Sequence, residues 1–196
     1  MASEGIQTSP GSSLPYPKQG WQKWAFRAPL LLWRMGLGPV VGKIIMVITT
    51  TGHKSKQPRH NMAEYYTLNG KKYTVCAYGE KAAWYKNIKA DPRVTVQTAG
   101  GAQNMEAVRV TDDRELLQVV ELFMRRNSTL TGRYLASLGI KPDRSDLLTK
   151  KDRLYLLRFD PIAGPTPPGL EADLKWIWPV IGFGIMLLSW LRKKIF

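Results

Sequence analysis

The Asn69-Gly70 dipeptide constrains the fold of this chain more than any other feature of its sequence. It lies between two β-rich runs, 63–67 and 72–78. Asn-Gly is a preferred centre for a tight hairpin because both residues tolerate positive φ. A second hairpin is predicted over residues 93–110, where two alternating runs flank the turn Ala99-Gly100-Gly101-Ala102. Two successive hairpins predict a sheet with antiparallel strands.

Further strands and helices are predicted around these hairpins. The apolar run 44–48 indicates a buried strand, and the last strand is expected at 153–159. Helices are predicted at 80–90, at 113–125 behind an Asp112/Glu115 capping box, and at 130–138, with a polar loop at 141–151. About six strands without regular βαβ alternation predict an α+β, mainly β fold: a small, mostly antiparallel barrel with flanking helices.

This barrel is expected to occupy residues 43–160, and the chain before it divides into two parts. Residues 1–19 are rich in Ser, Gly and Pro and lack an apolar core, which predicts a disordered arm. Residues 20–42 contain a basic, Trp-rich amphipathic helix and a lead-in to the barrel. Such a helix either lies in a membrane interface or caps the open end of the barrel.

The chain after the barrel begins with a Pro/Gly linker at 161–170 and continues as an apolar helix at 171–196. Residues 176–191 carry no charge, and sixteen helical residues span roughly 24 Å, against ~30 Å for a bilayer core. Tryptophans at both ends and the terminal Arg-Lys-Lys are typical of a membrane anchor. We therefore expect a tail-anchored or interfacial protein at the cytoplasmic face of the cell membrane. The alternative is a core or dimer-forming helix.

Charge and cysteine content narrow the class of partner. The 29 Lys and Arg against 15 Asp and Glu give a net charge of +14, which favours an acidic ligand, an anionic surface or nucleic acid. We expect no nucleic acid, because the sequence has no basic recognition helix or known nucleic-acid module. The single cysteine, Cys76, excludes an internal disulfide and fits a buried strand position in a reducing compartment. With only His53 and His60 nearby, no metal site is expected.

The segment 49–61 is the candidate binding site. It follows the buried strand and combines hydroxyl side chains, a glycine and cations in one turn. Hydroxyls, backbone N–H groups and fixed positive charge together suit an anionic, phosphate-bearing ligand. The alternative is a solvated basic hairpin that only connects two strands.

Two segments carry a resemblance to a known family. Residues 49–59, T-T-T-G-H-K-S-K-Q-P-R, resemble the T-T-T-G-R-K-S-G-x-P-R signature of the deazaflavin-dependent nitroreductase family. Residues 84–96, W-Y-K-N-I-K-A-D-P-R-V-T-V, are similar to its second signature, W-Y-x-N-L-x-A-N-P-x-V-x-V. Order and separation also agree, and the resemblance covers about residues 40–160.

The resemblance implies a split β-barrel of the flavin- or deazaflavin-binding type. It further implies an F420H2-dependent oxidoreductase that passes a hydride from the deazaflavin to a quinone, enone or nitroaromatic. Because a membrane anchor is expected, the acceptor should be lipophilic, with a menaquinone-type quinone as first choice. The implied coenzyme contacts are Thr51, Gly52, Lys54, Ser55, Arg59, Gly79, Lys81, Trp84 and Asn87. Lys54 and Arg59 would bind anionic oxygens, and Trp84 and Asn87 would meet the ring or its ribityl chain.

Two positions depart from the family pattern. His53 stands where Arg is usual, and Lys56 stands where Gly is usual, which strains the turn if φ is positive. FMN is therefore kept as an alternative coenzyme.

The catalytic residues are unknown from the sequence, and no triad is expected because the chemistry belongs to the coenzyme. Tyr65, Tyr66, Tyr78 and Tyr134 are candidate acids at the acceptor site, and plain packing is the alternative for each. A rival hypothesis is a non-catalytic flavin-, haem- or lipid-binding barrel tethered to membrane. A homodimer is possible.

Overall fold

The computed structural model describes residues 28–195, with side chains as far as residue 186. The predicted arm at 1–19 and the start of the predicted amphipathic helix at 20–27 lie outside the described residues. The strands are β1 (Ile45–Thr51), β2 (Pro58–Glu64), β3 (Tyr66–Leu68), β4 (Lys71–Val75), β5 (Arg93–Thr98), β6 (Gly101–Arg109) and β7 (Leu156–Pro161).

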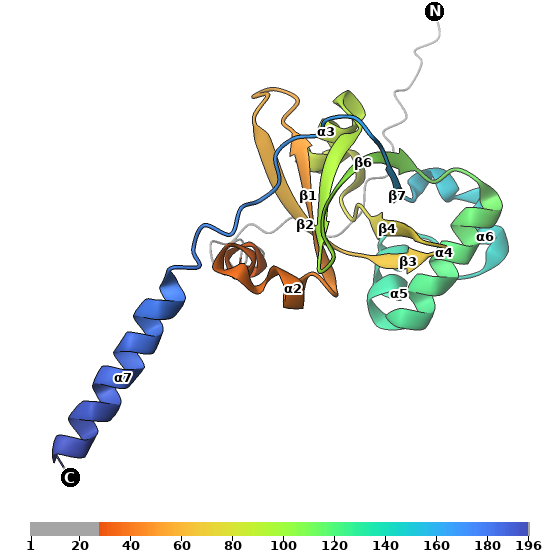
Figure 1. The fold of residues 1–196 in the computed structure, drawn as a ribbon. Helices are drawn as coiled ribbons and strands as arrows, with labels where there is room; N and C mark the ends of the chain where they lie inside the picture. The colour runs from red at the N-terminus through yellow and green to blue at the C-terminus, as the bar shows by residue number, and fades with distance from the viewer. Residues whose placement is uncertain (1–27, 196) are drawn as a thin grey trace, which may run out of the picture.

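These strands form one seven-stranded sheet in the order β2-β1-β5-β6-β7-β4-β3 (Figure 1). Every pair is antiparallel. Within the described residues β2 and β3 are the edges, so the strongly curled sheet does not close through strand pairing. The prediction of a mainly antiparallel sheet with flanking helices is confirmed, although the sheet has seven strands rather than about six.

Both predicted hairpins are present. Asn69 and Gly70 have φ of 51° and 76°, as the turn between β3 and β4 requires. The β5–β6 hairpin pairs Thr98 with Gly101 at its tip. The extra strand arises because the segment predicted as one strand at 63–67 is divided at Tyr65 into the end of β2 and the start of β3.

The helices are α2 (Gly38–Val41), α3 (Ala83–Ala90), α4 (Asp113–Arg126), α5 (Ser128–Ser137), α6 (Arg144–Thr149) and α7 (Ile177–Ile195), with a π-helical turn η1 (Trp33–Leu37) and 3₁₀ turns η2 (Gly79–Lys81) and η3 (Lys151–Arg153). The predicted polar loop at 141–151 was wrong, because it contains α6 and the start of η3. Asp143 caps α6 by accepting the N–H of Asp146 at 2.9 Å.

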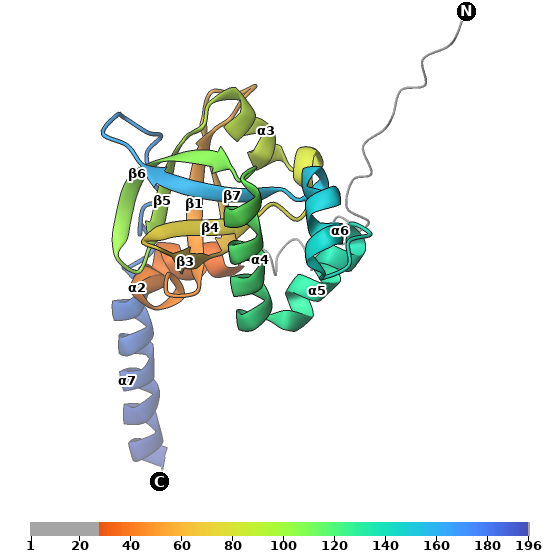
Figure 2. The same ribbon diagram turned by 90° about the vertical axis from the view of Figure 1, so that its right-hand side faces the viewer.

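Two hydrophobic cores lie on opposite faces of the sheet. The inner core, under α3, includes Met46, Ile48, Val94, Val96 and Phe159. The outer core packs α4, α5 and α6 against β4 and β7, and these three helices gather on one side of the molecule (Figure 2). Successive side chains of β7 point to opposite faces of the sheet, since Leu156 belongs to the outer core and Leu157 to the inner one.

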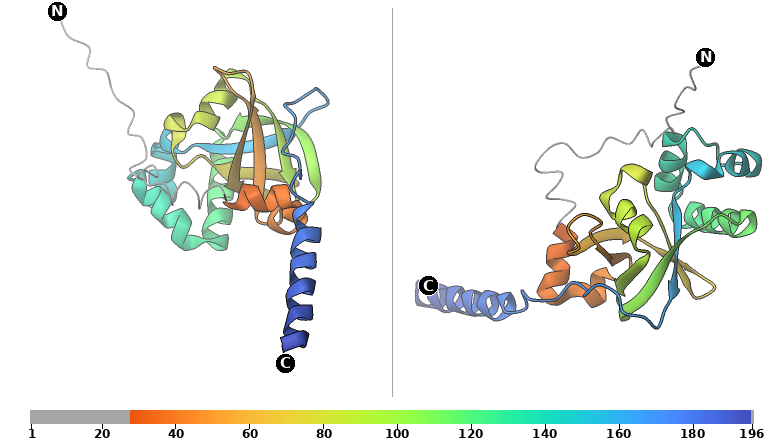
Figure 3. Two further views of the ribbon diagram at one scale, coloured as in Figure 1. Left: turned by 90° about the vertical axis from the view of Figure 1, so that its left-hand side faces the viewer. Right: turned by 90° about the horizontal axis from the view of Figure 1, so that it is seen from above.

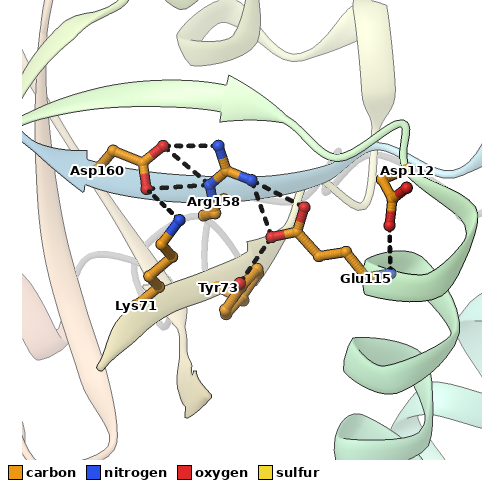
Figure 4. Close-up of polar contacts among 6 residues, drawn as sticks. All are labelled: Lys71, Tyr73, Asp112, Glu115, Arg158 and Asp160. Atoms are coloured by element: carbon orange, nitrogen blue, oxygen red, sulfur yellow. Dashed lines mark hydrogen bonds and ion pairs between the residues drawn. The ribbon is translucent and has the colours of Figure 1, made fainter. Parts of the chain in front are cut away.

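An ion-pair network fastens α4 to the sheet. Arg158 on β7 donates to both oxygens of Glu115 at 2.9 and 2.8 Å and to Asp160 at 3.0 and 2.9 Å (Figure 4). Tyr73 donates to the same Glu115 carboxylate at 2.7 Å. Asp112 caps α4 as predicted, accepting the N–H of Glu115 at 2.8 Å. The Glu115 side chain turns to Arg158 and Tyr73, so its predicted share in a capping box is replaced by this network.

The segment before β1 packs on the end of the sheet. Trp33 is 6% exposed, and the carbonyl of Gly42 accepts both the Ala99 N–H at 3.0 Å and the Tyr65 hydroxyl at 2.9 Å. The described part of the predicted amphipathic helix therefore caps one end of the sheet, which was one of the two alternatives.

The segment after β7 crosses the outside of β5 and returns to the N-terminal helix. Gln97 binds the backbone of Leu170 twice, donating to its carbonyl at 3.0 Å and accepting its N–H at 2.6 Å. Arg34 then pairs with Asp173, and the Trp178 indole donates to the Met35 carbonyl at 2.7 Å. The predicted linker is thus a strap held by side chains of β5 and η1.

Beyond this strap, α7 stands away from the body of the molecule (Figure 3). The prediction of a membrane anchor in residues 176–191, and with it a place at the cell membrane, was wrong. No helix among the described residues is both long and apolar enough to cross a bilayer. A core position for α7 is also excluded, because Val180, Phe183 and Ile185 are 60%, 61% and 64% exposed.

Candidate functional site

The candidate binding segment is a short loop between two strand ends. β1 continues to Thr51 and β2 begins at Pro58, so the predicted turn of 49–61 shrinks to residues 52–57. The loop closes through two backbone bonds, from Gly52 N–H to the Gln57 carbonyl at 2.9 Å and from Lys56 N–H to the Gly52 carbonyl at 2.8 Å.

Gly52 lies in a crowded part of the loop. A Cβ on Gly52 would lie 2.5 Å from the Ser55 hydroxyl and 3.1 Å from the Gln57 carbonyl. Lys56 has φ of 56°, so the residue that departs from the family's glycine occupies the left-handed conformation that glycine favours. The positive φ on which the expected strain depends is therefore present.

The loop presents cations and a hydroxyl to solvent. Lys54, Ser55 and Arg59 are all exposed, and the Arg59 guanidinium donates to the Ser55 hydroxyl at 3.2 Å. Thr51 is the last residue of β1, directly before the loop. The structure therefore brings five of the predicted contact residues together around one loop: Thr51, Gly52, Lys54, Ser55 and Arg59.

Asn87 joins the second signature to the first. It is 4% exposed on α3, and its amide oxygen accepts the His53 backbone N–H at 3.0 Å and contacts His53 Nδ1 at 2.8 Å. Its amide nitrogen donates to the hydroxyl of Thr50, which is fully buried, at 2.9 Å. These contacts tie Asn87 to Thr50 near the end of β1 and to His53 on the loop, so its amide holds the loop in place.

The predicted helix at 80–90 is broken at Ala82, which has an extended backbone with ψ of 128°. Gly79 and Lys81 belong to the separate turn η2, where their N–H groups already donate to the Cys76 and Tyr78 carbonyls. Gly79 and Lys81 were implied as coenzyme contacts, and the structure shows that their backbone N–H groups are already bonded within the protein. Gly79 has φ of 49°, and the ring of Tyr155 lies against it.

Trp84 lies near the start of α3 and packs, half-buried, against the inner core. Tyr78 precedes η2 and packs against the same core. Both residues belong to the elements next to Asn87, so they stand on the same side of the sheet as the loop's anchor.

The other three candidate tyrosines are elsewhere. Tyr65 donates to the Gly42 carbonyl at the end of β1 where the strand begins, near Ile45. Gly52 follows the other end of β1, so the length of that strand, about 20 Å, separates Tyr65 from Gly52. Tyr66 packs edge-on against Phe123 in the outer core, and burial together with the Glu64 carboxylate raises its pKa to about 12. Tyr134 is buried in the outer core, and burial raises its pKa. The four tyrosines therefore do not form one acceptor site.

An apolar cavity in the outer core does not offer a second site. Its volume is about 10 Å³, and Phe123, Tyr134 and Leu135 are among the residues that line it. A cavity of this size holds about one water molecule. Among the described residues no three His, Cys, Asp or Glu side chains are grouped to hold a metal.

Sequence reasoning missed two features of this region. One is the bridge that Asn87 makes to His53 and to Thr50, because nothing in a linear sequence shows that Asn87 reaches either residue. The other is a stack in which the Arg109 guanidinium lies 4.6 Å from the Tyr155 ring centre, and Tyr155 meets Tyr85 on α3 edge-on at 5.1 Å.

Comparison with known proteins adds a family match. Residues 34–134, just over half of the chain, match the family model described as F420H(2)-dependent quinone reductase. Among solved structures, one named F420-H2 dependent reductase (FDR-A) is 25% identical over 60% of this chain and 93% of its own, with a TM-score of 0.38. A putative pyridoxamine 5'-phosphate oxidase from Listeria innocua is 12% identical over 67% and 90%, with a TM-score of 0.41.

Proposed function

Since the chain belongs to the F420H(2)-dependent quinone reductase family, we propose that it transfers a hydride from reduced F420, bound at the loop 52–57, to a quinone. It is an oxidoreductase, and F420 is its coenzyme. Enones and nitroaromatics are the alternative acceptors. We also propose that the curled sheet is a split barrel whose coenzyme site lies at the loop end of β1.

The proposed role of the loop is to bind the anionic part of the coenzyme. Lys54 and Arg59 supply positive charge, and the Ser55 hydroxyl lies between them and the loop backbone. A guanidinium donates paired hydrogen bonds to phosphate or carboxylate oxygens, which suits a phosphodiester and a glutamate tail. What supports this proposal is that the buried Asn87 amide fixes the loop, so that these donors need little ordering when the ligand binds.

The proposed role of α3 is to border the deazaflavin ring. When bound, reduced F420 supplies the hydride and the acceptor gains that hydride and one proton, so the coenzyme is oxidised by two electrons. Trp84 offers a half-buried aromatic surface at this end of the site. Tyr78 is the candidate that stays near the site, and it would hold or donate the proton.

Replacing Arg59 by Ala tests the loop. We expect the Kd for F420, measured by calorimetry, to rise by the equivalent of about 1.5–3 kcal/mol, the range for hydrogen bonds to charged groups. The melting temperature should stay unchanged because the Arg59 side chain is exposed.

The matched control is Arg114→Ala, which removes the same charge from an exposed position on α4. Its Kd for F420 should equal that of the wild type. If Arg59→Ala binds F420 normally, the loop is not the coenzyme site. A parallel titration with FMN decides the coenzyme, since tighter binding of FMN would overturn the assignment of the site to F420.

A further inference from the structure

We propose that His53 is a coenzyme contact whose ring is oriented by Asn87, so that F420 binds more tightly when the imidazole is protonated. The inference rests on the proposed function of the loop and concerns the position at which this chain departs from the family signature.

The contacts of Asn87 fix which ring nitrogen of His53 carries a proton. The backbone N–H of His53 can only donate, so the Asn87 atom it meets at 3.0 Å is an acceptor, the amide oxygen. That same oxygen lies 2.8 Å from His53 Nδ1, and two acceptors do not bond to each other. Nδ1 therefore carries the proton, and Nε2 has the lone pair when the ring is neutral.

The free ring edge then decides what His53 offers to a ligand. Nε2 lies on the opposite side of the imidazole from Nδ1 and so faces away from Asn87. In the neutral ring its lone pair repels a phosphate or carboxylate oxygen. In the imidazolium it becomes a charged N–H donor, which such an oxygen accepts. An arginine at this position would donate at every ordinary pH, whereas histidine donates from Nε2 only when its ring is protonated.

Among the bonds that the described residues make, no carboxylate contacts the ring of His53. On α3 the group that contacts His53 is the Asn87 amide, which does not ionise and is bonded in turn to the Thr50 hydroxyl on β1. On its own loop the charged groups are Lys54, Lys56 and Arg59, all cations. Beyond α3, Asp91 is paired with Arg93 at 2.9 Å.

The experiment measures the Kd for oxidised F420 from roughly pH 5.5 to 8.5, an interval that brackets ordinary imidazole titration. The wild type is compared with His53→Gln and His53→Arg. The coenzyme's own titration is common to all three, so the ratio to the wild type isolates His53. We expect about tenfold tighter binding by the wild type than by His53→Gln at the acid end, vanishing at the alkaline end. His53→Arg should stay tight throughout.

A fourth variant, Asn87→Asp, tests the positioning role. Aspartate has the same shape and accepts from His53, and its negative charge favours the imidazolium. The tighter F420 binding seen at acid pH should therefore extend to higher pH in Asn87→Asp. A merely structural role of Asn87 would not shift this pH dependence. Parallel profiles for wild type and His53→Gln would overturn the inference. If Arg59→Ala weakens binding while those profiles stay parallel, the loop remains the coenzyme site and only the role of His53 fails.

Discussion

At the scale of single residues, the backbone at Lys56 sets a limit on the stability of the site. Its φ of 56° places a side chain where glycine is favoured. The left-handed conformation costs a non-glycine residue about 1–2 kcal/mol. Glycine removes this strain, but part of the gain is lost because glycine also makes the unfolded chain more flexible. The sequence alone could predict this strain, since the loop signature has glycine at that position.

Lys56→Gly should therefore stabilise the protein by up to about 1 kcal/mol in urea unfolding. The matched control is Lys54→Gly. Lys54 also lies on the loop and is exposed, but its φ is not positive, so glycine there should be neutral or destabilising. Equal effects from the two variants would show that relief of strain is not the cause.

Gly79 combines the same φ region with close contact. A Cβ there would lie 2.5 Å from the Tyr155 ring, at φ of 49°. Gly79→Ala should destabilise the protein by about 2 kcal/mol or more, the strain adding to the steric clash. Gly70→Ala separates the backbone strain from the steric clash, because Gly70 has φ of 76° but a Cβ there would have no neighbour within 4 Å. If both variants lose the same stability in thermal melts, the Tyr155 contact contributes nothing.

At the scale of elements, the ion-pair network makes the pairing of β7 with β4 sensitive to acid, because Asp160 pairs with Arg158 and Lys71. Burial alone would raise the pKa of Asp160, but Arg158 and Lys71 outweigh it and hold the pKa below the ordinary value of 3.8. A carboxyl with a lowered folded-state pKa stabilises the fold above its unfolded pKa. This contribution is lost as pH falls through the folded value, so the window lies below about pH 4.

Asp160→Asn should remove this contribution, about 1 kcal/mol at neutral pH because the carboxylate is partly exposed. The variant should then lose less stability than the wild type between neutral pH and strong acid, measured by urea unfolding at each pH. Glu121→Gln is the control, since its partner Arg125 is also exposed on α4. A variant curve parallel to the wild type would contradict the network's role.

Elements were predictable where the signal was local. The Asn69-Gly70 hairpin and the Asp112 cap needed only neighbouring residues, and both are present. Boundaries failed where pairing decided them: β2 begins at Pro58 because it pairs residue by residue with the end of β1. Asn87 was identified as a site residue, but its role depends on residues 34 and 37 positions away, which no local pattern shows.

At the scale of the whole molecule, the described part of α7 has large apolar side chains that are exposed to solvent. Its apolar composition was read correctly, but composition does not show what a helix packs against. Among the described residues, the contacts that hold α7 lie at its base, where the Trp178 indole bonds to the Met35 carbonyl, and just before it, where the Leu174 N–H bonds to the Arg34 carbonyl. Large exposed apolar side chains promote association in water. A homodimer through this helix stays a prediction.

A variant ending at Lys175 tests this directly. It keeps the strap contacts of Gln97 and Asp173 and removes the exposed side chains of Trp176, Phe183 and Ile185. In sedimentation velocity we expect the full chain to form larger species as concentration rises, and the shortened chain to stay monomeric. Its Kd for F420 should remain within about twofold, since removing distant, independent contacts leaves the loop unchanged. Monomers in both cases would exclude dimerisation through α7. A large loss of F420 affinity on truncation would instead show that the helix contributes to the coenzyme site, either directly or through a partner copy.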